Sequence, residues 1–497
     1  MRSDSRLLVI DEGTTGTRAL VFDGIGRVRS QAYSEFTQYH PGRDRVEHDP
    51  EEIWQVTCAC ITQALHDCGT EPRELAGIGI TNQRATTVLW DRTTGAAVAP
   101  AIVWQDLRTA GMATRLAPTW GQTVQARTGW TLAPVYSSLS LCWILDGDKD
   151  LARRAEAGEL AFGTIDSWLT HRLTGGKVHA ISASNAAVTG SYDLLASSWY
   201  SDWLGAIGLP LSLFPEVVDD SGIIGTTEAG VVAAAVPIAA AIADQSAALF
   251  GQGCVHPGDA KSTHGTGTFL DVNVGSEPVI SQHGLSSIIA WRRHGITTYG
   301  LEGYAPVTGA AVQWLRDGAE LLGSAAETED LARSVEDNNG VYFVPALTGL
   351  GAPSWDSSAR GLLIGISPGT SRGHIARAVL EGIVYSIKDF IDLMSEESGR
   401  PITSMRADGG AAANNFLLQF QADMLDVTIH RPANVEATAS GAAYLAGLAV
   451  GIWAEPEDCF RQTGDDAVFT PSLDIESRGA NYAQWQRAVG RAKGWAV

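Results

Sequence analysis

Residues 7–23 read LLVIDEGTTGTRALVFD, and this stretch decides the fold. Two apolar runs, residues 7–10 and 19–22, flank a short loop rich in glycine and threonine. Apolar runs of this length between turn residues predict two buried strands joined as a β-hairpin. The loop offers hydroxyls, backbone amides and Arg18, and Asp11 stands at the end of the first strand. These groups suit a phosphate site with a divalent cation on Asp11, although an ordinary hairpin with a polar turn fits the segment alone equally well.

Two further glycine-rich turns repeat this pattern later in the chain. Residues 260–273, AKSTHGTGTFLDVN, place a second Gly-Thr turn before an apolar strand. Residues 402–416, ITSMRADGGAAANNF, place a Gly-Gly turn before a helix. Three such turns predict a duplicated fold that grips one nucleotide. The chain has neither a P-loop motif nor a dinucleotide-binding Gly-x-Gly-x-x-Gly turn after a strand, so those two enzyme classes are not expected.

Composition limits the function classes. The 497 residues are too many for one core and predict at least two domains. The net charge of −21 argues against a surface for nucleic acid or anionic membranes. The sequence shows no apolar window of membrane-spanning length and no secretory leader before the first strand, so we expect a cytoplasmic protein without membrane or nucleic-acid partners. A homodimer and a homotetramer both fit the sequence.

Strands alternate with helices along the chain, which predicts α/β layers. Strand patterns occur at residues 77–80, 86–91, 102–104 and 342–345, and Asp49-Pro50 predicts a helix start. We place a domain boundary near Gly251, giving an N-terminal domain of residues 1–251 and a C-terminal domain of residues 252–497. A small substrate is expected in the cleft between them.

Ordered motifs through almost the whole chain carry a family resemblance. They include GITNQR at 79–84, IVWQ at 102–105, FGTIDSW at 162–168, Asp244-Gln245, QWLRD at 313–317, TGLGAP at 348–353 and GAAYLAGLAV at 441–450. The chain resembles the FGGY sugar kinases of the actin/hexokinase/Hsp70 superfamily, and the glycerol kinases among them most closely. The resemblance implies two actin-like (ribonuclease H-like) domains that close around ATP, Mg²⁺ and a small polyol or sugar.

The resemblance also implies a role for individual residues. Asp11 would position the magnesium, and Asp244 would be the catalytic base. The implied nucleotide contacts are Thr14, Thr15, Gly16 and Arg18 at the phosphates, Thr266, Gly309 and Gln313 in the second domain, and Gly410 and Asn414 at the adenosine. The implied polyol contacts are Arg84, Trp104, Asp244 and Gln245.

These residue types suit phosphoryl transfer to an alcohol, which needs charge neutralisation and a carboxylate that takes the hydroxyl proton. Each has a plainer interpretation as well. Asp244 could simply cap the helix expected at Gln245, Trp104 could belong to the core, and Arg84 could form a surface ion pair.

The chain departs from the glycerol kinases in the polyol pocket. Those enzymes have a glutamate directly after the arginine, where this chain has Ala85. They have a tyrosine where an ungapped match places Val135, although a one-residue shift would bring Tyr136 to that position. Both changes remove hydroxyl-binding groups and open space. We therefore expect a kinase of glycerol or of a longer polyol such as a tetritol or pentitol. A pentulose (xylulose- or ribulose-type) kinase, or a non-catalytic ligand sensor on the same fold, is the alternative.

Overall fold

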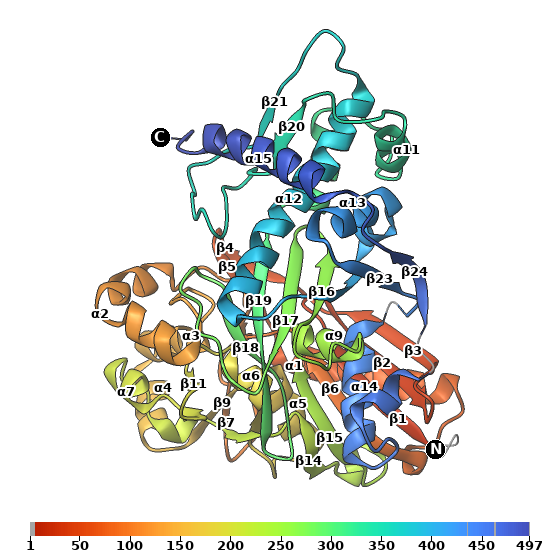
Figure 1. The fold of residues 1–497 in the computed structure, drawn as a ribbon. Coiled ribbons are helices and arrows are strands. Elements are labelled where there is room, and N and C mark those ends of the chain that lie inside the picture. Colours follow the sequence, from red (N-terminus) through yellow and green to blue (C-terminus); the bar gives the residue numbers. More distant parts are fainter. Residues whose placement is uncertain (1–4, 435, 462–463, 497) are drawn as a thin grey trace.

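One long mixed sheet runs through the molecule in the computed structural model, which describes residues 5–434, 436–461 and 464–496 (Figure 1). Its 13 strands follow each other in the order β24 (Asp465–Phe469), β23 (Thr428–Pro432), β22 (Ser404–Asp408), β16 (Asp259–His264), β17 (Thr268–Gly275), β19 (Ile296–Ala305), β18 (Ser286–Arg293), β14 (Ser221–Thr226), β15 (Pro237–Ala243), β6 (Leu75–Asn82), β1 (Arg6–Glu12), β2 (Gly16–Asp23) and β3 (Val28–Glu35). The strands of the first half of the chain thus lie at one end of the sheet and those of the second half at the other.

The hairpin predicted at residues 7–23 is confirmed. β1 and β2 pair antiparallel, with Ile10 opposite Ala19, and their apolar residues are buried. β1 also pairs parallel with β6, and β6 pairs parallel with β15. The carboxyl ends of these three parallel strands therefore meet at one edge of the sheet, where ligands bind in open α/β sheets.

The helices of the first half of the chain lie partly on this sheet and partly beside it (Figure 1). They are α1 (Pro50–Asp67), α2 (Ala110–Thr128), α3 (Ser137–Gly147), α4 (Lys149–Glu156), α5 (Ile165–Leu173), α6 (Ala183–Ala187), α7 (Ser201–Ala206), α8 (Ala229–Val232) and α9 (Asp244–Gly251). As predicted, α1 begins at Pro50, and the Asp49 side chain accepts a hydrogen bond from the Glu51 N–H, which satisfies one of the free amides of the first turn.

The helices of the second half are α10 (Gly309–Gln313), α11 (Glu327–Arg333), α12 (Arg372–Ser398), α13 (Asn415–Leu425), α14 (Ala437–Ala449) and α15 (Ile475–Ala492). α14 returns to the other end of the sheet, where it packs on α9, β6, β15 and β1. Its alanine-rich surface permits this close approach: a Cβ on Gly79 of β6 would lie 2.6 Å from the Ala442 carbonyl oxygen.

Short strands form separate small sheets. They pair as β4 (Tyr39–Gly42), β5 (Arg45–His48) and β8 (Ala101–Ile102); β7 (Val88–Asp91) and β9 (Leu160–Gly163); β10 (Ala180–Ser182) and β13 (Glu216–Val218); β11 (Tyr192–Asp193) and β12 (Ser198–Trp199); β20 (Tyr342–Val344) and β21 (Leu362–Ile364). The strand predicted at residues 102–104 needs a correction, because β8 ends at Ile102 and Trp104 lies in the loop beyond it.

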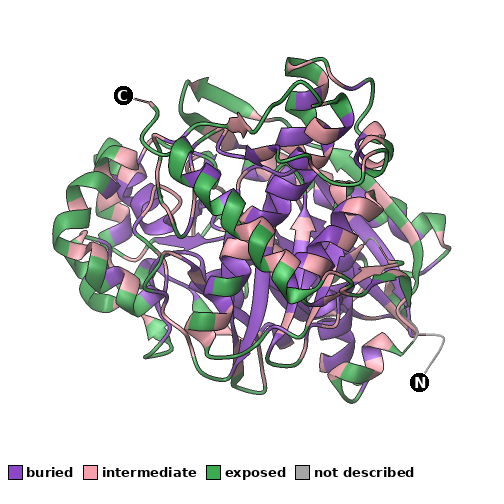
Figure 2. Cartoon of the chain, turned by 45° about the horizontal axis from the view of Figure 1, so that its top comes forward, coloured by how far each residue is buried: buried purple, intermediate pink, exposed green. Residues whose placement is uncertain are grey.

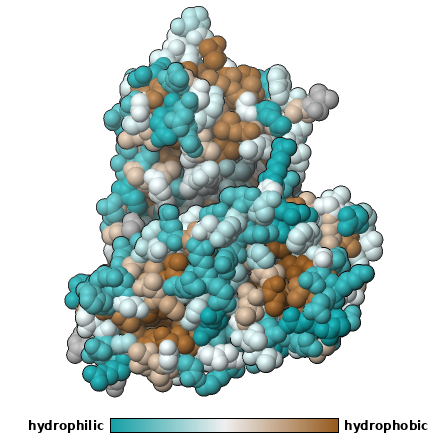
Figure 3. Space-filling model, turned by 180° about the vertical axis from the view of Figure 1, so that it is seen from behind, coloured by the Kyte–Doolittle hydropathy of each residue, from teal (hydrophilic) through white to brown (hydrophobic). Residues whose placement is uncertain are grey.

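The buried residues follow the sheet and the helix faces turned toward it, while the outer helix faces are exposed (Figure 2). Seen from behind, a narrower upper part rises above a broader lower one, and hydrophobic residues gather in separate patches among hydrophilic ones (Figure 3). Among the described residues, no helix has the length and apolar character needed to cross a bilayer.

Candidate active site

Three of the predicted site residues of the first half lie at the ends of three parallel strands. Asp11 lies near the end of β1, Arg84 follows β6, and Asp244 follows β15 directly. Register pairs Asp11 with Thr81 and Ala243 with Asn82, so the three strand ends lie side by side. The sequence predicted the strands that became β1 and β6 but not β15, and the parallel order of the three explains why residues so far apart in the chain meet.

The first glycine-rich turn joins β1 to β2 and is closed by a hydrogen bond from the Gly13 N–H to the Gly16 carbonyl. Thr14 is half-buried and Thr15 exposed in this turn. A Cβ on Gly16 would lie 2.6 Å from the Ser34 carbonyl oxygen, so the close approach of β3 requires glycine there. The Trp104 indole N–H donates to the Thr14 hydroxyl at 3.0 Å, which places Trp104 directly beside the predicted phosphate turn.

Arg18 links Asp11 to a residue that the sequence analysis missed, Glu436. Its guanidinium donates to the Asp11 carboxylate and, at 2.6 Å, to Glu436 just before α14. Burial raises the pKa of Asp11 to about 6 against the lowering effect of Arg18, and the charge of Asp244 contributes to the rise. Asp11 and Asp244 are thus close enough to influence each other electrostatically.

The donor set at Asp11 fits magnesium. Mg²⁺ commonly binds through one or two carboxylates together with substrate phosphates and water rather than in an all-protein cage. Asp11 offers one nearly buried carboxylate beside the phosphate turn. The described residues contain no group of three or more histidine, cysteine, aspartate or glutamate side chains that could hold a metal by themselves.

A cavity of about 640 Å³ in the second half is lined by all five residues predicted there as nucleotide contacts. Thr266 sits in the turn between β16 and β17, and β16 pairs parallel with β22, which leads to Gly410. The lining residues also include His264, Arg316 and Glu329, and the five predicted ones are Thr266, Gly309, Gln313, Gly410 and Asn414.

Local packing and hydrogen bonds explain the presence of two of these residues. The Gly309 N–H donates to the Gly265 carbonyl at 3.0 Å, and a Cβ on Gly309 would lie 2.6 Å from that oxygen, so only glycine allows the turn and α10 to approach. The Asn414 side chain caps α13 by accepting from the Leu417 N–H at 3.0 Å and donates to the Thr328 hydroxyl at 3.1 Å. Asn414 therefore shapes the cavity wall as well as lining it.

The predicted polyol site centres on Arg84. Its Nε lies 3.2 Å from an Asp244 oxygen, and its Nη1 donates to Glu302 of β19 at 2.6 Å. The guanidinium also lies over the rings of Trp130 and Phe269. The plainer interpretation of Arg84 as a surface ion pair does not describe this site, because only 14% of the side chain is exposed.

Asp244 is the first residue of α9, and one of its oxygens accepts from the Gln245 N–H at 2.6 Å. Burial raises the pKa of Asp244, opposed by Arg84 and Lys261. A raised pKa favours proton acceptance by a carboxylate, and the Asp244 side chain remains one-third exposed.

The structure defines the surroundings of the residues at which the chain differs from the glycerol kinases, and of Tyr136 beside them. Ala85 is buried with φ of 59°, a left-handed conformation that is uncommon outside glycine. Val135 is half-buried against the core around α3. Tyr136 is fully buried, its ring packs on Gly190 and its hydroxyl donates to the Trp130 carbonyl at 2.5 Å, so its phenol is not open to a ligand in this structure.

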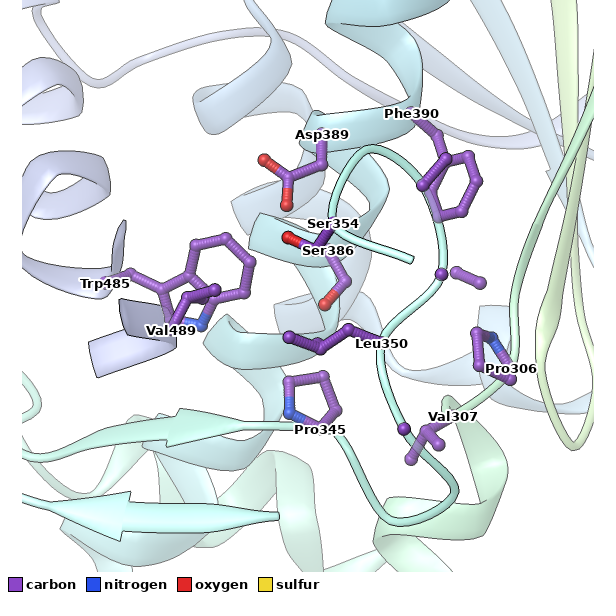
Figure 4. A pocket seen from close by; sticks show the side chains of 14 residues that line it. Pro306, Val307, Pro345, Leu350, Ser354, Ser386, Asp389, Phe390, Trp485 and Val489 are labelled. Atoms are coloured by element: carbon purple, nitrogen blue, oxygen red, sulfur yellow. The ribbon is translucent and has the colours of Figure 1, made fainter. Parts of the chain in front are cut away.

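A second, much smaller cavity of about 30 Å³ lies under α15 and α12 (Figure 4). Pro345, Leu350 and Trp485 line it, with Asp389 at its edge, and none of the predicted site residues contributes to it. It is too small for a nucleotide or a sugar.

The glycine-rich turns, the cavity of the second half and the Arg84 cluster with carboxylates from both halves fit a protein that transfers phosphoryl groups. The chain belongs to the FGGY family of carbohydrate kinases: the family's N-terminal domain matches residues 6–251 and its C-terminal domain residues 260–450.

Individual relatives narrow the comparison. A glycerol kinase of Petrotoga mobilis is 48% identical over 490 residues, which are 98% of each chain. The crystal structure of Plasmodium falciparum glycerol kinase with ADP has a TM-score of 0.94 and 30% identity, covering 98% of both chains. The xylulose kinase of Rhodospirillum rubrum, with a TM-score of 0.86 and 22% identity over 98% of both chains, shares the fold.

Proposed function

We propose that this protein transfers the γ-phosphoryl group of ATP to a terminal hydroxyl of a small polyol. The observation that carries the proposal is Asp244, a carboxylate with a raised pKa held beside Arg84 at the same sheet edge as Asp11. The full-length similarity to glycerol kinases supports the substrate class.

In this mechanism Asp244 accepts the proton of the attacking hydroxyl as its oxygen bonds to the γ-phosphorus. The bond between that phosphorus and the β–γ bridging oxygen breaks, and ADP leaves. Arg84 and Gln245 hold the polyol hydroxyls, and Trp104 covers its carbon face. Residues 1–251 and 252–497 act as two domains that contribute opposite walls of the cleft.

Thr14, Thr15, Gly16 and Thr266 would contact the phosphates, and Gly309, Gln313, Gly410 and Asn414 the nucleoside. Asp11 would hold Mg²⁺, which supplies charge neutralisation on the phosphates. In this structure the Arg18 guanidinium donates to both Asp11 and Glu436. To contact a phosphate it would have to break its hydrogen bond to Asp11, and that movement would free the Asp11 carboxylate for the metal.

Within the polyols, we propose that a tetritol or pentitol is preferred to glycerol. The supporting observation is Ala85, a methyl group where the glycerol kinases have a carboxylate. Tyr136 does not replace the missing phenol, because its hydroxyl is bound to Trp130. A pentulose kinase remains the second candidate for the same reason, since an enlarged pocket would also admit a ketose.

The test is a coupled ATP-turnover assay on glycerol, tetritols, pentitols and pentuloses. A polyol should give the highest kcat/KM. A pentulose that exceeds every polyol would instead establish the second candidate. Absence of turnover on the entire panel, with ATP still bound, would point to the sensor alternative.

A further inference from the structure

Lys261 is a fully buried lysine that joins the two halves of the candidate site. It lies on β16, four residues before Gly265, where the turn that contains Thr266 begins. Its Nζ donates to the Gln245 side-chain oxygen at 2.8 Å and to the Thr263 hydroxyl at 3.3 Å. Gln245 lies in the first turn of α9, directly after Asp244. One ammonium group therefore ties the base-bearing helix to the strand of the second glycine-rich turn.

The charge of Lys261 is matched by a buried partner. Its Nζ lies 2.6 Å from an Asp271 oxygen on the neighbouring strand β17, and both side chains are completely buried. Burial alone would lower the pKa of Lys261, but Asp271 and Asp408 outweigh it and hold the pKa above its ordinary value. A buried pair of this kind is a poor source of stability, because desolvation offsets the attraction, so its presence calls for another role.

The contact with Lys261 fixes the orientation of the Gln245 amide. A lysine ammonium has only donors, so the group facing it must be the amide oxygen. The amide nitrogen is then left with its two N–H donors, and it has no hydrogen-bond acceptor in the described part of the chain. Gln245 is half-buried and follows Asp244 directly in the chain, so these N–H donors are available to the lone pairs of a substrate hydroxyl. An amide turned the other way would present an acceptor next to a carboxylate, which would compete with Asp244 for the hydroxyl proton.

We propose that Lys261 is a positioning residue for the polyol: by holding the Gln245 oxygen, it presents the Gln245 N–H groups to the substrate hydroxyl beside Asp244. This inference rests on the proposed polyol kinase activity. It assigns no contact between Lys261 and the substrate. It predicts that loss of Lys261 raises the KM for the polyol but leaves the affinity for ATP unchanged.

The test removes the ion pair as a unit with Lys261→Met/Asp271→Leu. Replacing both partners of a buried ion pair with apolar residues is often neutral or stabilising, whereas removing one leaves an uncompensated charge. We expect the double variant to fold with a Tm near wild type, and its KM for the best polyol of the panel to rise about tenfold, the value of one lost hydrogen bond. Its Kd for ATP should stay within twofold.

Asp271→Asn is the matched control, because it keeps Lys261 and its hydrogen bond to Gln245. We expect it to lower Tm while the polyol KM stays within threefold. The two variants thus separate stability from positioning. An unchanged polyol KM in Lys261→Met/Asp271→Leu would overturn the proposal, as would a KM that rises in both variants in proportion to lost stability. If the leucine does not fold, Lys261→Met/Asp271→Asn makes the same comparison.

A double-mutant cycle shows whether Lys261 acts through Gln245. Gln245→Leu alone should raise the polyol KM. Adding Lys261→Met/Asp271→Leu to Gln245→Leu should raise the KM no further. Independent, multiplying effects would contradict the proposal. The proposed function is tested separately by turnover of the wild type on the panel. An inactive wild type would refute the proposed kinase activity, whereas full activity and an unchanged polyol KM in Lys261→Met/Asp271→Leu would refute only the role of Lys261.

Discussion

Arg84 and Glu302 lie 218 positions apart in the chain, yet their largely buried side chains meet at 2.6 Å. Arg84 follows β6 of the first half and Glu302 belongs to β19 of the second. The same guanidinium holds Asp244 on its other side. One arginine thus orients the proposed base and joins the two halves of the sheet at the site.

Replacing Asp244 with asparagine should remove the base while it keeps the shape of the site. We expect kcat on the best polyol to fall by about 10²–10⁴-fold, the usual contribution of a positioned general base. Calorimetry should show ATP binding within a few-fold of wild type. Asp202→Asn, at an exposed position of α7, is the control. A kcat close to wild type in Asp244→Asn would remove Asp244 from the mechanism.

The activity should depend on pH through Asp244. Because burial raises its pKa, kcat/KM should fall on the acid side at a pH above about 3.9, the ordinary value for an aspartate. The base works ionised, so activity rises with pH through this transition. A pH profile of wild type measures it. An acid limb at or below the ordinary aspartate value would show that the site does not raise the pKa of its base.

Thr266→Arg should block nucleotide binding, because an arginine in the turn after β16 would fill the cavity that Gly309 and Gln313 also line. We expect at least a tenfold loss of ATP affinity by calorimetry with little change in Tm. Thr93→Arg, in the exposed loop after β7, should bind ATP like wild type. Equal ATP affinity in both variants would move the nucleotide out of this cavity.

Short-range sequence patterns predicted part of the fold, because the elements concerned are determined by neighbouring residues. The β1–β2 hairpin, the start of α1 at Pro50 and the turn at Thr266 depend on residues close in sequence. Glu302, Trp130 and Lys261 were missed because their roles come from the docking of distant strands. An acidic residue in the apolar run around Glu302 and a lysine before the turn were the only signals in the sequence.

Neighbouring residues at the pocket could not be told apart by sequence either. Val135 and Tyr136 differ by one position, and the start of α3 turns the Tyr136 ring into the core against Gly190. Trp104 was expected on a strand, but β8 ends earlier and leaves the indole 40% exposed beside Thr14. Loop geometry of this kind follows from packing rather than from periodicity.

Glu12 should make the protein less stable as pH rises. It is fully buried on the α1 side of β1, and burial raises its pKa to about 8 despite hydrogen bonds from Thr17 and Thr57. The unfolded carboxyl ionises near pH 4, so between about pH 4 and 8 the folded state binds more protons and stability falls with increasing pH.

We therefore expect Glu12→Gln to raise Tm at pH 8 more than at pH 5, by several degrees. Thermal unfolding at the two pH values measures the difference, with Glu35→Gln at the exposed end of β3 as the control. The same Tm change at both pH values would show that Glu12 is ionised throughout.

Restoring a carboxylate at position 85 should shift specificity towards glycerol. Ala85→Glu, alone or with Val135→Tyr, adds acceptors for glycerol hydroxyls and narrows the pocket. One hydrogen bond to a charged group contributes about 1.5–3 kcal/mol, so we expect kcat/KM for glycerol to rise about tenfold to a hundredfold and the value for tetritols or pentitols to fall. If wild type already prefers glycerol and Ala85→Glu weakens it, the enlarged-pocket argument is wrong.

The most direct test of the central claim is the product formed by the wild-type protein from ATP, Mg²⁺ and each polyol, identified by ³¹P NMR alongside ADP release. The account predicts one phosphomonoester of a terminal polyol hydroxyl for each ADP formed, and it predicts that Asp244→Asn forms both products about 10²–10⁴-fold more slowly. ADP release without a phosphorylated polyol, or a phosphomonoester that Asp244→Asn forms at the wild-type rate, would contradict it.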